Sequence, residues 1–400
     1  MRPRVGAVAA TFVVNGLGGP SFQPRLPERQ AALGLSDAGL GVVLVGFAVG
    51  ALVASPVAGR LIGTLGSRPV AVAAAVALGA SLWTAGAAPT PLTLGLALAL
   101  IGASDAAMDT AMNANAAAYE GGTGRSIMHR LHGAWSLGAL AAAGVAALAA
   151  GLRIPITLQL AVTGLVVAGT VLVARPGLVP GLSPVPPEEG SDSGPSPAAR
   201  SSGRRLWASA LVVLAVMTVG GAIVEGAPTD WSALRLERLG TGPGTAALGV
   251  AAFMAGMFAG RAIGDHLTDR YGGAAVLRLG MILVAAGLGL GVVVDRPAGF
   301  AAGLVLAGAG ASAFFPLAFS TAARLPGVAP GAGAATVSLA ARLGFLAEPL
   351  VIGALAQAIG LRWAFLFVAA VALALAVAAS RIVPASARLG PAPVTDVRAW

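Results

Sequence analysis

The sequence predicts an all-α membrane protein with twelve transmembrane helices arranged as two six-helix bundles. Three observations predict this fold: the composition, the number of apolar runs, and a polar segment that divides those runs six and six. Hydrophobic residues make up 57% of the 400 residues and charged residues only 10%. A soluble protein of this length has about 25% charged residues, so the chain is expected to lie in a lipid bilayer.

Twelve apolar runs are long enough to span a membrane, since a helix crosses the hydrocarbon core with about 20 residues. The first follows MRPR and has the basic and apolar regions of a signal peptide, but no small-residue cleavage site comes after it, so we expect it to be retained. Gly and Pro interrupt several runs, as membrane helices tolerate. The predicted spans are 6–24, 39–62, 69–88, 92–116, 131–150, 154–174, 206–229, 244–265, 273–294, 298–321, 332–357 and 361–383.

The polar segment between spans six and seven reads RPGLVPGLSPVPPEEGSDSGPSPAARSSGRR. It is rich in Pro, Gly and Ser and can bury no core, so it is predicted to be a flexible linker. The sequence therefore divides into an N-terminal bundle (1–174), a cytoplasmic linker (175–205), a C-terminal bundle (206–383) and a cytoplasmic tail (384–400).

The two halves also resemble each other when one is shifted by 206 residues. The matches fall around the second span of each half, and a duplicated six-helix unit is typical of many secondary transporters. The matched pairs are Gly34 with Gly240, Phe47 with Phe253, Gly50 with Gly256 and Gly66 with Gly272.

The arginines predict the orientation. If both termini are cytoplasmic, 17 arginines fall in inside segments and seven in outside segments, which agrees with the positive-inside rule. Tryptophans near span ends are expected to act as interfacial anchors; they are Trp83, Trp135, Trp207, Trp231 and Trp363. We therefore expect a multi-pass protein of a bacterial cytoplasmic (inner) membrane.

Composition also narrows the chemistry. There is no cysteine, and the three histidines are scattered, so we expect no metal and no cofactor. The net charge of +9 comes from arginines that stand singly or in pairs between apolar runs, which suits membrane topology and not a nucleic-acid partner. His129 and His132, at the start of span five, could sense pH or make contacts at the helix start.

Two carboxylates and an amide lie inside the fourth predicted span. Asp105, Asp109 and Asn113 are spaced four residues apart and form one stripe on a helix. An Asp at a span centre costs about 2.5–3.5 kcal/mol on insertion, so these side chains should face protein or a water-filled cavity. The carboxylates could exchange a proton, or they could have a structural role, capping helix ends or holding Arg125 or Arg130 at the cytoplasmic boundary.

Two later spans carry further charges. Arg342 and Glu348 are six residues apart in span eleven, about 240° around a helix, so each needs a partner elsewhere, with Glu225 a candidate for Arg342. Glu225 and Asp230 lie near the outer end of span seven beside a proline and Trp231. A broken helix there would border a substrate site, and the alternative is an interfacial loop.

Two loops carry a family resemblance. GRAIGDHLTDRYGG follows span eight at 260–273, and GRLIGTLGSRP follows span two at 59–69. Both resemble the G-x-x-x-D-R-x-G-R-[KR] loop that marks the major facilitator superfamily. The second copy keeps Asp269, Arg270 and Gly272. The first keeps Gly59, Gly66 and Arg68, but Gly63 and Thr64 stand where the family has Asp and Arg.

Three stretches resemble the fucose-permease-like branch of that superfamily. They are AMDTAMNANAAAYE at 107–120, SIMHRLHGAWSLGAL at 126–140 and EGAPTDWSAL at 225–234. The resemblance implies a carrier in which membrane carboxylates couple transport to protons. That branch also has an acid in its first helix, whereas the first span here offers Asn15 and Gln23, which leaves proton coupling open.

We therefore expect a secondary active transporter, a symporter or antiporter that works as a monomer and moves a small solute between its two bundles. A transport-inactive receptor or scaffold is the alternative, and a membrane-embedded enzyme has less support. The expected substrate or coupling residues are Asp105, Asp109, Asn113, Arg342 and Glu348, followed by Asn15, Gln23, Glu225 and Trp231. The expected cytoplasmic gate consists of Gly59, Gly66, Arg68, Asp265, Asp269, Arg270 and Gly272.

Overall fold

The computed structural model describes residues 4–124, 127–180, 199–323 and 330–382, together with Leu325 and Val328. The first half contains α1 (Val5–Asn15), α2 (Gly18–Phe22), the 3-10 helix η1 (Gln23–Arg25), α3 (Leu26–Ala32), α4 (Asp37–Leu65), α5 (Ser67–Ala87), α6 (Pro91–Thr123), α7 (Met128–Gly151), α8 (Ile156–Ala174) and the 3-10 helix η2 (Arg175–Gly177). The second half contains α9 (Ala199–Arg238), α10 (Pro243–Tyr271), α11 (Gly273–Val294), α12 (Pro297–Ala311), α13 (Phe314–Ala323), α14 (Pro330–Ile359) and α15 (Leu361–Ile382).

These helices form two six-helix bundles, as the sequence predicts. Eleven segments of the described chain are long and apolar enough to cross a membrane, and α1 with the segment Gly18–Ala32 makes a twelfth, bent by 45°. The outward faces are apolar: Val173 is 83% exposed and Leu165 is 73% exposed. Single exposed apolar side chains are normal in water, but so many of them on the outer surface indicate that its solvent is lipid.

The duplication of the two halves extends to their helix contacts. A Cβ atom at Gly50 of α4 would lie 1.8 Å from the carbonyl oxygen of Ala99 in α6, and one at Gly256 of α10 would lie 2.0 Å from that of Val305 in α12. Both positions in the second pair lie 206 residues after those in the first. Glycine is required in both because the backbones approach closely, which is the main way that helices associate in lipid.

Glycine also shapes the same turns in both halves. Gly34 and Gly240 precede α4 and α10 with φ of 59° and 87°, and Gly66 and Gly272 follow these helices with φ of 89° and 81°. Residues with a Cβ rarely adopt such angles. The three glycine pairs that the sequence predicts therefore occupy equivalent places.

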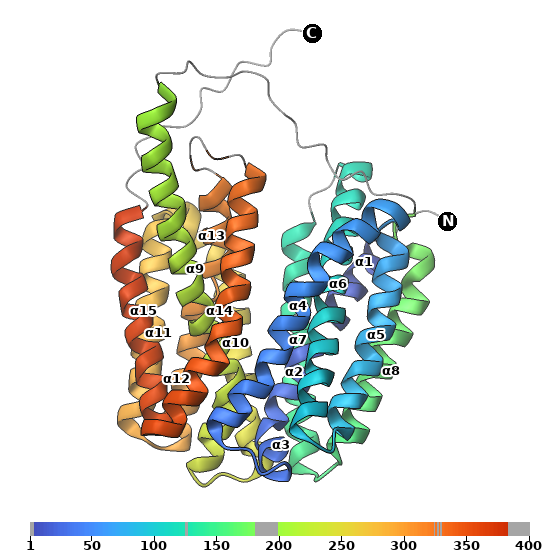
Figure 1. Cartoon of the computed structure of the whole chain (residues 1–400), viewed down its shortest axis with the longest axis vertical. Helices are drawn as coiled ribbons and strands as arrows, with labels where there is room; N and C mark the ends of the chain where they lie inside the picture. The colour runs from blue at the N-terminus through green and yellow to red at the C-terminus, as the bar shows by residue number, and fades with distance from the viewer. Residues whose placement is uncertain are drawn as a thin grey trace.

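The two ends of the molecule differ in how the halves meet (Figure 1). We call the end where α4 and α10 terminate and α9 begins the linker end, and the opposite end the distal end. A Cβ at Gly41 in α4 would lie 2.2 Å from the carbonyl oxygen of Pro349, across the interface near the distal end. Gly59 lies about five turns further along the same face of α4, and nothing lies within 4 Å of a Cβ there.

The other pair of helices at the interface, α7 and α10, also lies close together only near the distal end. On α7, a Cβ at Gly151 would lie 3.7 Å from Gly244 in α10, whereas Gly133, about five turns toward the linker end, has nothing within 4 Å. The halves therefore touch at the distal end and diverge toward the linker end, as Figure 1 shows.

The structure also departs from the predicted spans. The first span runs on to Ala32 and is bent, and the tenth is broken at residues 312–313 between α12 and α13. Pro316 follows that break, and its missing N–H group removes one helical hydrogen bond there. Helix α9 begins inside the predicted linker, at Ala199. The remaining linker residues 181–198 and the predicted tail 384–400 lie outside the described residues.

Candidate functional site

The first group of predicted site residues meets between α1, α6 and α7. Asn15 is buried, and its Nδ2 atom donates a hydrogen bond to Asp105 Oδ1 at 3.0 Å. The Oδ1 atom of Asn15 accepts one from Trp135 Nε1 at 2.9 Å. Asn15 therefore fixes both the carboxylate and the indole, and Trp135 serves the interior of the protein and not only the membrane interface.

Asp109 and Asn113 continue the same stripe along α6. Asn113 Nδ2 donates to Asp109 Oδ1 at 3.1 Å and to its backbone oxygen at 2.9 Å. Asp109 is accessible to solvent, although protein surrounds it on most sides. A group that is both accessible and deep lines a crevice, so Asp109 faces the region between the halves and not lipid.

Arg342 of α14 faces these carboxylates from the second half. Its charge interacts with both Asp105 and Asp109, and its Nη1 atom donates to the carbonyl oxygen of Ala51 in α4 at 3.1 Å. Arg342 therefore bridges the halves, with its partners in the first. The predicted pairing of Arg342 with Glu225 is replaced by this arrangement.

The partner of Glu225 is instead Arg261 of α10, whose charge interacts with it. Arg261 Nη1 also donates to Ser136 Oγ in α7 at 2.8 Å, and its guanidinium lies 5.7 Å from the centre of the Trp135 ring. Sequence reasoning counted Arg261 among the arginines of the inside segments, although it lies near the end of the predicted span 244–265, and so gave it no role in the site. Its place on the interface side of α10 could have been found from the helical phase of that span.

A second polar cluster lies nearer the distal end. Gln23 Nε2 of the first half donates to Asp230 Oδ1 of the second at 2.7 Å. Trp231 Nε1 donates to Glu348 Oε1 at 3.0 Å, and both of these side chains are buried. Trp231 is therefore a core residue, and the prediction that it anchors the membrane interface is wrong.

An ion pair joins the halves at the same end. Arg238 of α9 pairs with Asp37 at the start of α4. Gln30 Nε2 in α3 also donates to Asp37 Oδ1 at 2.8 Å. This pair adds a charged contact to the close packing of Gly41 against Pro349.

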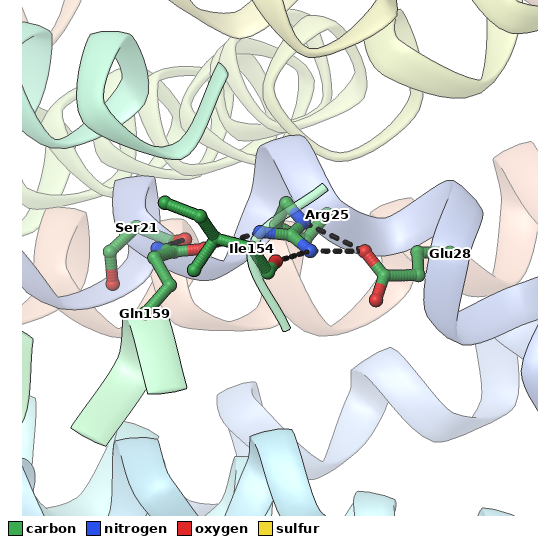
Figure 2. Close-up of polar contacts among 5 residues, drawn as sticks. All are labelled: Ser21, Arg25, Glu28, Ile154 and Gln159. Atoms are coloured by element: carbon green, nitrogen blue, oxygen red, sulfur yellow. Dashed lines mark hydrogen bonds and ion pairs between the residues drawn. The ribbon is translucent and has the colours of Figure 1, made fainter. Parts of the chain in front are cut away.

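Within the first half, Arg25 ties the bent first span to α8 (Figure 2). Its guanidinium donates to Gln159 Oε1 at 3.0 Å and to the carbonyl oxygen of Ile154 at 2.9 Å, and it pairs with Glu28. Gln159 Nε2 donates in turn to the carbonyl oxygen of Ser21 at 2.9 Å. The bond to Ser21 satisfies a carbonyl group just before η1, and the bonds of Arg25 tie η1 to the start of α8.

The predicted gate residues lie at the linker end and are spread over both halves. Gly66 and Gly272 form the turns, Arg68 is half-buried, and Asp265, Asp269 and Arg270 are exposed. The Arg270 guanidinium lies 5.4 Å from the centre of the Tyr271 ring. No ion pair of Asp269 is found among the described residues, as expected where the halves are apart.

Among the described side chains, His132 contacts an aromatic ring and no histidine cluster is found. His132 packs edge-on against Phe12, with ring centres 5.4 Å apart, and the side chain of His129 lies outside the described part of the chain. No group of three or more His, Cys, Asp or Glu side chains that could hold a metal ion occurs among the described residues.

Two helical bundles that enclose paired charges between them define a membrane transport protein of the duplicated type. The family model described as Major Facilitator Superfamily matches residues 8–233 and 230–398. The chain belongs to this superfamily and is a membrane transporter.

Known relatives agree with the family. The chain is 33% identical over 380 residues to the uncharacterized transporter y4wD of Sinorhizobium fredii, covering 93% of this chain and 96% of the relative. It is 32% identical over 380 residues to the membrane protein MosC of Rhizobium meliloti, covering 94% and 89%.

Solved structures show the same fold. A structure of the nucleoside transporter NupG has a TM-score of 0.76 at 13% identity, covering 94% of this chain and 98% of the other. A bacterial homolog of the human lysosomal transporter Spinster, in an inward-facing and unoccupied conformation, has a TM-score of 0.69 at 15% identity, covering 96% and 98%. At these identities the likeness concerns the fold alone.

Proposed function

We propose that the protein is a secondary active transporter that moves a small polar solute by rocking its two bundles about a central site. One observation carries this proposal. Carboxylates of α6 and an arginine of α14 face each other from opposite halves, and those halves touch at one end and diverge at the other. A solute bound between these groups would be reachable from the linker end only, which is what alternating access requires of one of its two states.

The proposed orientation places the linker end in the cytoplasm. The excess of arginines in the linker-end segments supports it through the positive-inside rule. In this orientation the structure is the inward-facing state of a monomer in the cytoplasmic membrane. The Spinster homolog with a similar fold carries that same description.

We assign the substrate site to Asp105, Asp109, Asn113 and Arg342. A carboxylate pair beside one arginine offers both hydrogen-bond acceptors and a donor fork, so the solute should carry hydroxyl or amine groups. Proton coupling would use the same carboxylates, because two like charges within reach of each other favour retention of one proton. Glu225 with Arg261, and Trp135 with Asn15, would line the remainder of the site.

The finer placement in the fucose-permease-like branch is part of this proposal. The three stretches that carry the resemblance contribute Asp109 and Asn113, Trp135 and Ser136, and Glu225 to the region between the halves. The resemblance thus falls on residues that would touch a solute.

The experiment is a two-step assay on the purified full-length chain. A thermal-shift screen against a panel of sugars, polyols, amines and nucleosides identifies ligands that stabilise the folded protein. Counterflow of a labelled ligand is then measured in proteoliposomes. Counterflow that is lost in Arg342→Ala supports the proposal, whereas binding without counterflow identifies a transport-inactive receptor.

A further inference from the structure

A chain of contacts runs from an arginine of the second half to a carboxylate of the first. Arg261 Nη1 donates to Ser136 Oγ at 2.8 Å, and the guanidinium lies 5.7 Å from the centre of the Trp135 ring. Trp135 Nε1 donates to Asn15 Oδ1 at 2.9 Å, and Asn15 Nδ2 donates to Asp105 Oδ1 at 3.0 Å. We call Arg261, Trp135, Asn15 and Asp105 the relay. It joins α10, α7, α1 and α6 in that order.

The relay has a fixed hydrogen-bond direction. An indole N–H group can only donate, so Asn15 must turn its oxygen toward Trp135 and its NH2 group toward Asp105. Among the described residues, no hydrogen bond to the other oxygen of Asp105, Oδ2, is found, and this side chain is half-buried. The relay therefore orients the carboxylate through one oxygen and leaves the other for a solute.

The middle of the relay is held rigidly within the first half. A Cβ atom at Gly16 would lie 2.3 Å from the carbonyl oxygen of Trp135, and one at Gly138 would lie 2.1 Å from that of Val13. The backbones of the first span and α7 are therefore in direct contact beside Asn15. Asn15 and Trp135 keep their relative positions when the second half moves.

Arg261 is the member of the relay that belongs to the second half, and it lies at the edge of the contact between the halves. Its partner Ser136 is buried. Gly133, about one turn further toward the linker end, has nothing within 4 Å of a Cβ. The bond from Arg261 to Ser136 thus lies where α10 and α7 begin to diverge. Rocking of the halves must displace Arg261 relative to Trp135.

The duplication does not repeat the relay. The second half has the same helix packing without these side chains, so the packing does not require them. By the shift of 206 residues, the equivalents of Arg261, Trp135, Asn15 and Asp105 are Ser55, Ala341, Gly221 and Ala311.

We propose that Arg261 is a positioning residue for Asp105 and acts on it through the relay. A cation over the Trp135 ring makes the indole N–H a stronger donor, and the Asn15 amide is polarised in turn. Asp105 is then held in one orientation and is pre-organised for the solute. When the halves rock and Arg261 leaves the ring, this support weakens and the solute is released more readily. The relay rests on the proposed alternating access.

The test follows both ends of the relay by NMR, in purified full-length protein with ¹⁵N in the tryptophan indoles and ¹³C in the aspartate carboxyl groups. Loss of a signal in Trp135→Phe or Asp105→Asn assigns it. In Arg261→Met, the Trp135 N–H signal should move upfield. Its exchange with solvent should become about two- to fivefold faster, the size of one exposed cation–π contact. The Asp105 carboxyl signal should move as well, and Trp135→Phe should also move it. Ser136→Ala should move both signals less, and it remains informative if Arg261→Met misfolds.

Two variants show whether the charge of Arg261 is responsible. Arg261→Lys keeps the positive charge and should retain most of both signals. Arg362→Met is the matched control, because Arg362 lies 5.5 Å from the centre of the Trp363 ring. It should move the indole signal of Trp363 and leave those of Trp135 and Asp105 in place.

A wedge at the distal end tests the dependence on the halves. A Cβ at Gly41 would lie 2.2 Å from the carbonyl oxygen of Pro349 in the other half, so Gly41→Leu should push the halves apart there. It should move the Trp135 and Asp105 signals in the same direction as Arg261→Met. Gly63→Leu, where nothing lies within 4 Å on the same helix, should move neither.

Each failure has a separate meaning. If both signals stay in place in Arg261→Met and Ser136→Ala, the relay is wrong and alternating access is unaffected. Movement of the Trp135 signal alone would overturn the positioning of Asp105. A response to Arg261→Met without one to Gly41→Leu would overturn the dependence on the halves. A parent that shows no counterflow of any solute in the panel contradicts the proposed function, and the relay then fails with it.

Discussion

The two halves share their packing and differ in what they place between them. In the first half, a Cβ atom at Gly102 would lie 1.9 Å from the carbonyl oxygen of Phe47. In the second half, a Cβ atom at Gly308 would lie 2.1 Å from the carbonyl oxygen of Phe253. When the first half is shifted by 206 residues onto the second, Asp105 falls on Ala311 and Asp109 falls on Phe315. The duplication therefore repeats the helix contacts and does not repeat the charges.

The helices that carry these positions differ as well. Helix α6 is continuous over Pro91–Thr123, whereas its counterpart is broken into α12 and α13 beside Phe315. Phe315 lies edge-on to Phe314 at 5.4 Å and stacks on Phe345 at 5.9 Å. One half thus presents an acidic stripe and the other an aromatic cluster.

The arginines at the interface show the same asymmetry. Arg342 corresponds to Ser136, and Arg261 corresponds to Ser55. Both arginines belong to the second half, and both donate to the first, at Ala51 and Ser136. The comparison teaches that helix packing constrains the scaffold equally in both halves, whereas a site for an asymmetric solute needs different groups from each.

The strongest test of this asymmetry removes the cation of the second half. In Arg342→Ala, Asp105 and Asp109 lose the positive charge that faces them. Counterflow in proteoliposomes should fall by about a hundredfold or more, since breaking a buried pair costs about 3–5 kcal/mol. Arg278→Ala, at an exposed position of α11, is the control and should transport like the parent. Parental counterflow in Arg342→Ala would remove Arg342 from the site.

The next test concerns the acidic stripe of the first half. Asp105→Asn and Asp109→Asn keep the size of each side chain and abolish its charge. If these carboxylates carry the coupling proton, a proton gradient should no longer drive uptake, and the uptake rate under a gradient should fall by about tenfold. The uptake rate should also no longer depend on pH. Ala311→Ser, at the position equivalent to Asp105, should change neither property. Unchanged pH dependence in both Asn variants would rule out their coupling role.

Much of the scaffold could be predicted from the sequence because it depends on local rules. The length of an apolar run predicts a span, and glycines at equivalent places, such as Gly66 and Gly272, predict the turns. Helix ends were harder to place. The predicted span seven ends at residue 229, whereas α9 continues to Arg238, whose charge pairs with Asp37 of the other half.

The site was predictable only within single helices. The stripe of Asp105, Asp109 and Asn113 follows from helical spacing, but the helix that faces it does not. Gln23 and Asp230 lie far apart in the chain, and the equivalent of Asp230 in the first half is Pro24, so neither spacing nor duplication could reveal their hydrogen bond. Such pairs depend on the way helices pack, which periodicity does not encode.

A smaller effect tests the shared packing itself. Gly50→Ala and Gly256→Ala each place a Cβ within 2.0 Å of a carbonyl oxygen, so both should lower the free energy of unfolding by about 1–3 kcal/mol. Similar losses of thermal stability in detergent would confirm that the halves are equivalent scaffolds. Gly144→Ala, where nothing lies within 4 Å, should be neutral or slightly stabilising. A large difference between Gly50→Ala and Gly256→Ala would break the equivalence.

The smallest expected effect concerns one helix start that the duplication did not preserve. Thr90 caps α6 with a capping box, in which its side chain accepts from Thr93 N at 3.2 Å. The equivalent residue before α12 is Arg296, which makes no side-chain cap. Thr90→Ala should therefore cost about 1 kcal/mol, and Arg296→Thr should recover a similar amount in the second half. Thermal melts of both variants measure these changes in stability. A cap confers stability only where the first turn has unpaired N–H groups. Both helices begin with Pro in the same register, so their first turns are comparable. If Arg296→Thr is neutral while Thr90→Ala is costly, the α12 start has another partner for those groups and the two helix starts are not equivalent.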